Sequence, residues 1–200
     1  MNMEASPKPE TVDRRDLLLE AAIRVIADQG MRGLTHRAVE AEAGVPHGST
    51  TYYFGTRHEL LTALMAYMAE RGRRETEPIA HAMTLLLADR SKPIDIDSIA
   101  HAYVAFIDAS AELELARYEL QVTGARDPEM KRLMTEQCDV FRRMCEPIVI
   151  ACGSTDAKRD SRILQAALDG WMLDRLTHDG ASDDTIIEGM KMLLGAIGER

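Results

Sequence analysis

A group of residues between positions 35 and 57 has the chemistry to contact nucleic acid. Its members are Thr35, Arg37, His47, Ser49, Thr50, Tyr52, Tyr53 and Arg57, and Pro46 and Gly48 lie among them in the same segment. Hydroxyl and guanidinium groups bond phosphate oxygens, and short polar side chains can also reach base edges in the major groove. Two neighbouring elements would have to present these residues together.

Glycines divide this part of the chain into three short helices. Apolar residues recur at Leu18, Ala21, Ala22, Val25 and Ile26, which predicts one face of a helix over 12–29 that ends at Gly30. Thr35 is a suitable N-cap for a second helix, which Gly44 ends after about two turns. Pro46 suits the first position of a third helix. The tight turn at 44–45 gives the last two helices the dimensions of a helix-turn-helix unit.

The rest of the chain is also predicted to be helical, because strand-length runs with alternating polarity are missing. Thr56 and Glu59 form a capping box that starts a helix running to about residue 76. Residue 78 is a proline that should interrupt or restart this helix, with 79–88 again apolar, and 91–93 is a loop signal. Further helices are expected around 99–107, at 113–124, 128–152, 159–178 and 183–198. The fold class is therefore all-α, with about nine helices.

Composition and charge limit the functions that are possible. The chain has 200 residues, with 46% hydrophobic and 28% charged residues, which is ordinary for a globular protein. Its net charge of −9 argues against nucleic-acid binding by bulk charge, so any DNA contact must be local. No segment is apolar for the roughly 18 residues that a membrane helix needs, and the polar start does not resemble a signal peptide. We therefore expect a cytoplasmic protein that does not contact the membrane.

Four stretches in the first third of the chain resemble the TetR (tetracycline-repressor-like) family of bacterial transcriptional regulators. The matching stretches are Ala21-Ala22 with Gly30, Leu34-Thr35-His36-Arg37-Ala38-Val39, Ala43 to Phe54, and Thr56-Arg57-His58-Glu59-Leu60-Leu61. The resemblance covers residues from about 11 to 65, and residue type, order and spacing agree across four helices. Thr50 and Thr51 depart from it, since the family usually has a large apolar residue followed by tyrosine there. Arg57 replaces the common lysine and keeps the positive charge.

The resemblance implies a homodimer that places one recognition helix per subunit in the major groove of a palindromic DNA operator. It implies a tail at 1–10, a DNA-binding domain at 11–60, and a ligand-binding and dimerisation domain at 61–200. Thr35 and Arg37 would contact phosphate, and His47, Gly48 and Ser49 would lie at or near base edges. Tyr52, Tyr53 and Arg57 would brace the DNA backbone, although Tyr53 could equally pack in the core. We expect a repressor that a small-molecule inducer releases from the operator.

Two further sets of residues are predicted for the larger domain. The apolar faces near the C-terminus are wide enough to form a four-helix interface between two subunits. That set is Leu164, Ala167, Leu168, Trp171, Ile186, Ile187, Met190, Leu193, Leu194 and Ile197. The predicted ligand pocket is largely apolar and suits a largely apolar inducer. Its residues are Tyr103, Phe106, Tyr118, Met134, Phe141 and Trp171. Core packing within one subunit is the alternative explanation for both sets.

Other chemistries find little support in the sequence. Cys138, Cys145 and Cys152 are seven residues apart, so neighbouring thiols on one helix would be about 10.5 Å apart, too far for a disulfide. Buried structural cysteines are favoured over a thiol switch or an electrophile sensor. An enzyme built on a helical bundle would need paired Glu-x-x-His motifs, a zinc-ligand cluster, a phosphate loop or a Gly-x-Ser-x-Gly elbow. We therefore expect no catalytic residues, no metal and no cofactor. A helix-turn-helix module that binds only a protein partner remains an alternative.

Overall fold

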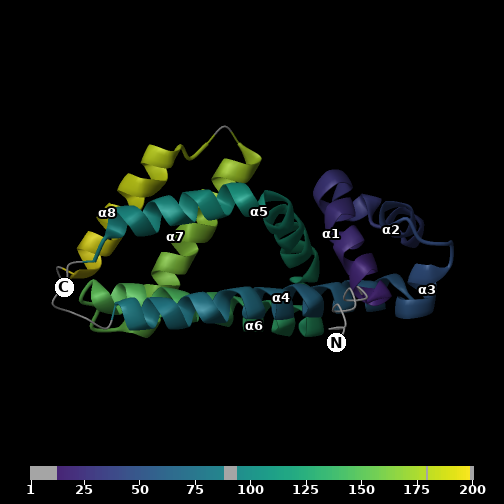
Figure 1. The fold of residues 1–200 in the computed structure, drawn as a ribbon, viewed down its shortest axis with the longest axis horizontal. Helices are drawn as coiled ribbons and strands as arrows, with labels where there is room; N and C mark the ends of the chain where they lie inside the picture. The colour runs from purple at the N-terminus through teal and green to yellow at the C-terminus, as the bar shows by residue number, and fades with distance from the viewer. Residues whose placement is uncertain (1–12, 88–93, 179, 199–200) are drawn as a thin grey trace, which may run out of the picture.

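The computed structural model describes residues 13–87, 94–178 and 180–198, and the described part of the chain is all helical. The helices are α1 (Arg14–Gly33), α2 (His36–Ala43), α3 (Ser49–Phe54), α4 (Arg57–Leu86), α5 (Ile96–Gly124), α6 (Pro128–Ala151), α7 (Ala157–Thr177) and α8 (Asp183–Gly198). In Figure 1, α1, α2 and α3 form a small head at one end of an elongated molecule, and α8 lies at the other end. The predicted tail at 1–10 and the loop at 91–93 lie outside the described residues.

Side-chain caps begin several of these helices where the sequence predicts them. Thr35 Oγ1 accepts from the amide of Ala38 at 3.1 Å and begins α2, while Gly44 ends it in the left-handed region at φ 63°. Asp127 Oδ1 accepts from the amides of Glu129 and Met130, at 2.9 and 3.1 Å, and Pro128 follows as the first residue of α6. Each cap satisfies amides that have no partner within the helix.

α4 connects the head to the rest of the molecule. It starts at the predicted capping box, where Glu59 Oε2 accepts from the Thr56 amide at 2.7 Å and Thr56 Oγ1 accepts from the Glu59 amide at 3.2 Å. It then continues to Leu86 and lies alongside α6 (Figure 1). The predicted interruption at residue 78 is therefore wrong. The predicted domain boundary between residues 60 and 61 falls inside this helix rather than in a loop.

Two apolar cores hold the molecule together. The first contains α1 and the buried faces of α2, α3 and the start of α4, closed by Ala116 and Leu120 of α5 and Met130 of α6. The second is built from the first half of α5, the end of α6, and α7 and α8. Because α5 and α6 contribute to both cores, the head and the body share two continuous helices.

The helix count differs from the prediction because neighbouring segments join. The segments predicted around 99–107 and at 113–124 form the single helix α5, and the segments on either side of residue 78 form α4. Pro46 is also placed differently: it lies in the turn before α3, whose first residue is Ser49, and not at the first helical position. These joins leave the all-α fold class as predicted.

Candidate nucleic-acid interface and ligand cavity

α2 and α3 present the predicted polar residues from two helices joined by a tight turn. Thr35 and Arg37 are exposed at the start of α2, and His47 and Gly48 are exposed just before α3. Gly48 has φ 92°, a conformation that costs glycine little and other residues more. Ser49 Oγ donates to the Pro46 carbonyl at 2.6 Å, which holds the turn against the helix. The structure therefore places both predicted groups at the surface of two helices that are in contact through His36 and Thr51.

The aromatic residues of α3 divide between surface and core. Tyr52 is 84% exposed and Tyr53 is 37% exposed, and their rings meet edge to face with centroids 5.1 Å apart. Phe54 is only 4% exposed and belongs to the first core. Both tyrosines can reach a partner outside the molecule, whereas Phe54 cannot.

Thr50 is the one predicted contact residue that the structure removes from the surface. Its relative exposure is 0%, and its hydroxyl donates to the His36 carbonyl at 3.4 Å. Its inclusion among the DNA-contacting residues is therefore corrected, because a fully buried hydroxyl cannot reach DNA. The neighbouring Thr51 is exposed instead, with its Oγ1 3.0 Å from His36 Nδ1. Thr50 thus takes the inward position of the large apolar residue that is usual in the TetR family.

Arg57 uses much of its guanidinium group to hold the head together. Nη2 donates to the carbonyl of Met31 at 2.6 Å, and Nη1 donates to the carbonyl of Leu34. These two carbonyls lie at the end of α1 and in the connection to α2. Arg57 is still exposed, so it fixes the position of α2 relative to α4 and leaves a positive charge at the surface.

A buried carboxylate that the sequence analysis missed lies beneath the start of α3. Glu40 of α2 is 4% exposed, and its Oε1 accepts from the amides of Gly48 at 3.0 Å and Thr50 at 2.9 Å. Its Oε2 lies 2.8 Å from His47 Nδ1. Burial favours the neutral acid, but hydrogen bonds from His47 and from the two amides outweigh burial and lower the pKa of Glu40 below its usual value. The sequence offered one signal for this burial, which is that Glu40 directly follows the inward-facing Val39. A charged residue that is fully buried seldom lacks partners, so a buried Glu40 would have predicted hydrogen-bond donors around it.

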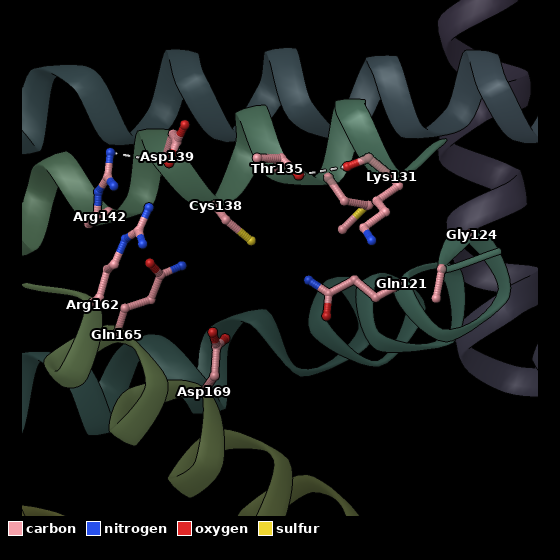
Figure 2. Close-up of a pocket in the computed structure, with 12 residues that line it drawn as sticks. Gln121, Gly124, Lys131, Thr135, Cys138, Asp139, Arg142, Arg162, Gln165 and Asp169 are labelled. Carbon is pink, nitrogen blue, oxygen red and sulfur yellow. Dashed lines mark hydrogen bonds and ion pairs between the residues drawn. The ribbon is translucent and has the colours of Figure 1, made fainter. Parts of the chain in front are cut away.

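A cavity of about 450 Å³ opens between α5, α6 and α7. Figure 2 shows Cys138, Gln165, Asp169 and Gln121 pointing into it from three helices. The complete lining is Gln121, Gly124, Ala125, Lys131, Met134, Thr135, Cys138, Asp139, Arg142, Arg162, Gln165 and Asp169. Its size suits a small organic molecule, and its lining carries amide, hydroxyl and thiol groups and both signs of charge.

Of the six residues predicted for the ligand pocket, only Met134 lines this cavity. Tyr103 is buried and donates to the Leu168 carbonyl at 2.5 Å, and Tyr118 donates to the Asp169 carbonyl at 3.0 Å. Phe106 is 42% exposed, while Phe141 and Trp171 pack against the second core. Apart from the exposed Phe106, the predicted aromatic residues pack within the body, and the cavity is lined by polar and apolar side chains of other residues.

A buried ion-pair network supports one wall of the cavity. The Arg117 side chain is 11% exposed, bonds Glu114 through Nε, and donates from Nη2 to Asp169 Oδ1 at 2.9 Å. The guanidinium carbon also lies 4.3 Å from the centroid of the Tyr118 ring. Burial acts against the charge, but Glu114 and Asp169 outweigh it and raise the pKa of Arg117 above its ordinary value. Asp169 is therefore held by α5 on one side while it faces the cavity on the other (Figure 2).

The residues predicted for the dimer interface mostly lie inside the subunit. Leu164, Leu168, Ile186, Ile187, Met190, Leu194 and Ile197 are all at most 8% exposed and belong to the second core. Ala167, Trp171 and Leu193 are partly buried. For the seven buried residues, the interface prediction is corrected, because a side chain enclosed by its own subunit cannot contact a second copy.

The opposite faces of the same two helices are apolar and exposed. On α7, Ile163 is 41% and Leu173 is 42% exposed, and on α8 Met192 is 76% exposed. Between them lie small exposed residues, which are Ala166, Gly170, Gly195 and Ala196. An added Cβ at Gly170 or Gly195 would meet nothing within 4 Å. We define these seven residues as the α7–α8 outer face.

An all-α protein with an exposed helix-turn-helix at one end and a cavity in a helical body has the architecture of a ligand-responsive regulator. Two family models match the chain. The model described as "Bacterial regulatory proteins, tetR family" matches residues 18–64, and that described as "Tetracyclin repressor-like, C-terminal domain" matches residues 95–197. The chain belongs to the TetR family of transcriptional regulators, with an N-terminal DNA-binding domain and a C-terminal ligand-binding domain. It is accordingly a regulator and not an enzyme.

Relatives and solved structures agree with this membership. The chain is 27% identical over 161 residues to the HTH-type transcriptional regulator BetI of Rhizobium meliloti, covering 78% of this chain and 75% of that protein. It is 26% identical over 172 residues to the HTH-type nicotine-responsive transcriptional repressor HdnoR of Paenarthrobacter nicotinovorans, covering 82% and 84%. The multidrug binding protein EbrR complexed with imidazole superposes with a TM-score of 0.65 at 28% identity, covering 94% of this chain and 96% of EbrR.

Membrane-spanning helices and metal-binding clusters are both absent from the described residues. None of the helices is long and apolar enough to cross a membrane, as far as residues 13–87, 94–178 and 180–198 show. In the same ranges, no three His, Cys, Asp or Glu residues lie together in a way that could hold a metal ion.

Proposed function

We propose that this protein is a cytoplasmic repressor that binds a palindromic operator as a homodimer and leaves it when a small molecule fills the cavity. The observation that carries the proposal is the exposed polar surface of α2 and α3, attached through α4 to a body that contains the cavity. Arg37 and Thr35 would contact phosphate, and His47 and Ser49 would lie at the base edges. Tyr52, Tyr53 and Arg57 would contact the backbone on either side.

Dimerisation through the α7–α8 outer face would place the two heads for this task. A two-fold axis brings the same patch of both subunits together, so a self-complementary apolar patch is the expected form of the interface. The small residues on this face allow two helices to approach closely. In helix-turn-helix dimers, the two recognition helices bind half-sites about 34–36 Å apart. Any change in the subunit arrangement alters that spacing.

The lining of the cavity combines apolar surface with polar side-chain ends, which supports a ligand that has both apolar and polar parts. Arg142 pairs with Asp139 Oδ1 through Nη2 at 3.1 Å, but its Nε is buried, has no hydrogen-bond acceptor among the described residues and lies 3.9 Å from Glu146 Oε1. Gln121, Gln165 and Asp169 point into the same space (Figure 2). A ligand with both acceptor and donor groups would satisfy these side chains. A small-molecule ligand is also supported by two similar proteins, one named a nicotine-responsive repressor and the other a multidrug binding protein.

Coupling between the two sites would follow a population shift. The cavity wall includes Gly124 and Met134, which adjoin the first core, and Gln165 and Asp169 of α7, which packs in the second. A ligand that binds best to one arrangement of the two cores favours that arrangement. If that arrangement separates the recognition helices by the wrong distance, operator affinity falls.

The test is operator binding by an Arg37→Ala variant. Footprinting on the DNA around the protein's own gene would first locate the operator. Because Arg37 would contact a phosphate, its loss should weaken binding about equally across operator sequences and reduce the slope of log K against log salt by about 1. Fluorescence anisotropy at several salt concentrations measures both quantities.

The matched control is Arg143→Ala, which removes an exposed arginine from α6 in the body. This variant should keep the wild-type affinity and salt slope. Equal salt slopes for Arg37→Ala and the wild type would show that Arg37 does not contact a DNA phosphate. Failure of the wild-type protein to bind any duplex in a salt-dependent way would refute the proposed function and favour a module that binds a protein partner.

A further inference from the structure

We propose that Glu40 is a positioning residue that fixes the tautomer of His47, so that His47 reads an amino-bearing base edge in the operator. The inference rests on the proposed DNA-binding function and adds to it the chemical identity of the base contact. One buried carboxylate, that of Glu40, both caps α3 and contacts the ring of His47, which is exposed and predicted to contact a base.

The two oxygens of Glu40 have separate tasks. Oε1 accepts from the amides of Gly48 and Thr50, so it holds the first turn of α3 in place. Oε2 faces His47 Nδ1 at 2.8 Å. An ionised carboxylate can only accept hydrogen bonds, so the Nδ1 atom of His47 must carry the proton of this contact.

The proton position at Nδ1 decides what the other ring nitrogen can do. In a neutral imidazole only one nitrogen carries hydrogen, so Nε2 of His47 is left as an acceptor. The His47 side chain is 80% exposed, whereas that of Glu40 is 5% exposed, so the ring projects outward from a buried anchor. An acceptor in the major groove pairs with the amino group of cytosine N4 or adenine N6, and not with the acceptor atoms of guanine.

The Glu40→Gln variant tests this assignment because it should reverse the tautomer with little change in shape. The amide oxygen of glutamine can keep both bonds to the start of α3. Its NH₂ group then replaces Oε2 and donates to Nδ1, which forces the ring proton onto Nε2. The exposed nitrogen becomes a donor, and the preferred base at the contacted position should change from cytosine or adenine to guanine.

The first measurement needs no DNA. A long-range ¹H–¹⁵N spectrum of the ¹⁵N-histidine-labelled full chain at pH 8 distinguishes the protonated from the unprotonated ring nitrogen. We expect Nδ1–H for His47 in the wild type and Nε2–H in Glu40→Gln, with His58 as an internal reference that does not change. An Nε2–H ring or a doubly protonated ring in the wild type would overturn the proposal.

The second measurement uses operator duplexes in which each position carries each base in turn. We expect one position per half-site at which the wild type prefers cytosine or adenine over guanine about tenfold, and at which Glu40→Gln reverses the order. His47→Ala should lose the preference at that position alone and keep the rest of the profile. This variant also keeps the test decisive if Glu40→Gln fails to fold, as judged by its circular dichroism.

The outcomes separate this inference from the proposed function. An operator that the wild type binds without any position depending on His47, or an unchanged profile in a folded Glu40→Gln, overturns the inference and leaves the proposed function intact. A wild-type protein that binds no duplex refutes the proposed function, while the spectrum still decides the tautomer.

Discussion

Cys145 is the most deeply enclosed of the three thiols, at 1% exposure within the second core. Burial raises the pKa of Cys145 to about 12, so at pH 8 only about one thiol in ten thousand is ionised. Cys138 and Cys152 are partly exposed. We expect iodoacetamide at pH 8 to modify Cys145 at least about a hundredfold more slowly than either of the others, since only the thiolate reacts.

Mass spectrometry of tryptic peptides at successive times measures the three rates in the native protein, and urea provides the control in which all three thiols should react alike. Native rates for Cys145 equal to those of Cys138 would contradict its burial. The cysteine spacing is interpreted as favouring buried structural cysteines. For Cys145, that interpretation depends on this result. Cys138, in contrast, lines the cavity.

At the residue scale, sequence patterns predict which positions face outward better than they predict partners. Helical periodicity and the resemblance identified the exposed Arg37 and His47 and the half-buried Ser49, which need only reach the surface. They failed for Thr50 because its small polar side chain gives no sign of being buried. Glu40 was missed because its burial depends on amides from the next helix and on the His47 ring, and no periodicity encodes that arrangement.

At the element scale, α7 and α8 have two apolar faces each, and the sequence showed only the larger. The residues with the greatest apolar volume, such as Leu164, Ile186 and Met190, fill the subunit's own core. The outer face is built from alanine and glycine with Ile163, Leu173 and Met192, a weaker signal in any hydrophobicity pattern. A similar limit explains α4, because packing along α6 supports one long helix in spite of the proline at residue 78.

A charge on the α7–α8 outer face should dissociate the proposed dimer without unfolding the subunit. Met192 is 76% exposed, so Met192→Lys adds no strain within one copy but places two like charges near the two-fold axis. We expect the dimer dissociation constant to rise at least about tenfold, a loss of about 1.4 kcal/mol. Analytical ultracentrifugation over a concentration series measures this constant, and thermal unfolding checks the fold.

Val122→Lys is the matched control, because Val122 is 72% exposed on α5 and lies outside the α7–α8 outer face. It should leave the dimer unchanged. A Met192→Lys protein that sediments as the wild type does would show that the dimer interface is not on the α7–α8 outer face. Since one head contacts only one half-site, dissociation should also weaken operator binding, which connects the interface to function.

At the scale of the whole molecule, the cavity lies where the two cores meet, and its position could not be predicted from composition. Aromatic and methionine residues suggested an apolar pocket, yet Tyr103 and Tyr118 bond backbone carbonyls of α7 and pack the body. Polar residues from three helices converge only after folding. The sequence did establish a division of tasks between two parts of the chain. Residues 31–60 are balanced in charge, with three basic and three acidic residues, whereas the body is acidic.

Cys138 allows the coupling between cavity and operator to be tested before any inducer is known. Its thiol points into the cavity (Figure 2), so N-ethylmaleimide attached there occupies part of the ligand's space. In a Cys152→Ser variant, with Cys145 protected by burial, Cys138 is the thiol that reacts. We expect the modified protein to bind its operator about 5- to 150-fold more weakly, the range of a coupling free energy of about 1–3 kcal/mol.

The Cys138→Ser variant is the matched control, because the reagent then modifies Cys152, which packs against the second core and does not line the cavity. Its operator affinity should not change on modification. Equal losses in both variants would indicate damage to the fold rather than coupling, and no loss in either would separate the cavity from the DNA-binding head. A loss confined to Cys138 would show that filling this cavity alters the arrangement of the two cores, and it would support the release mechanism independently of ligand chemistry.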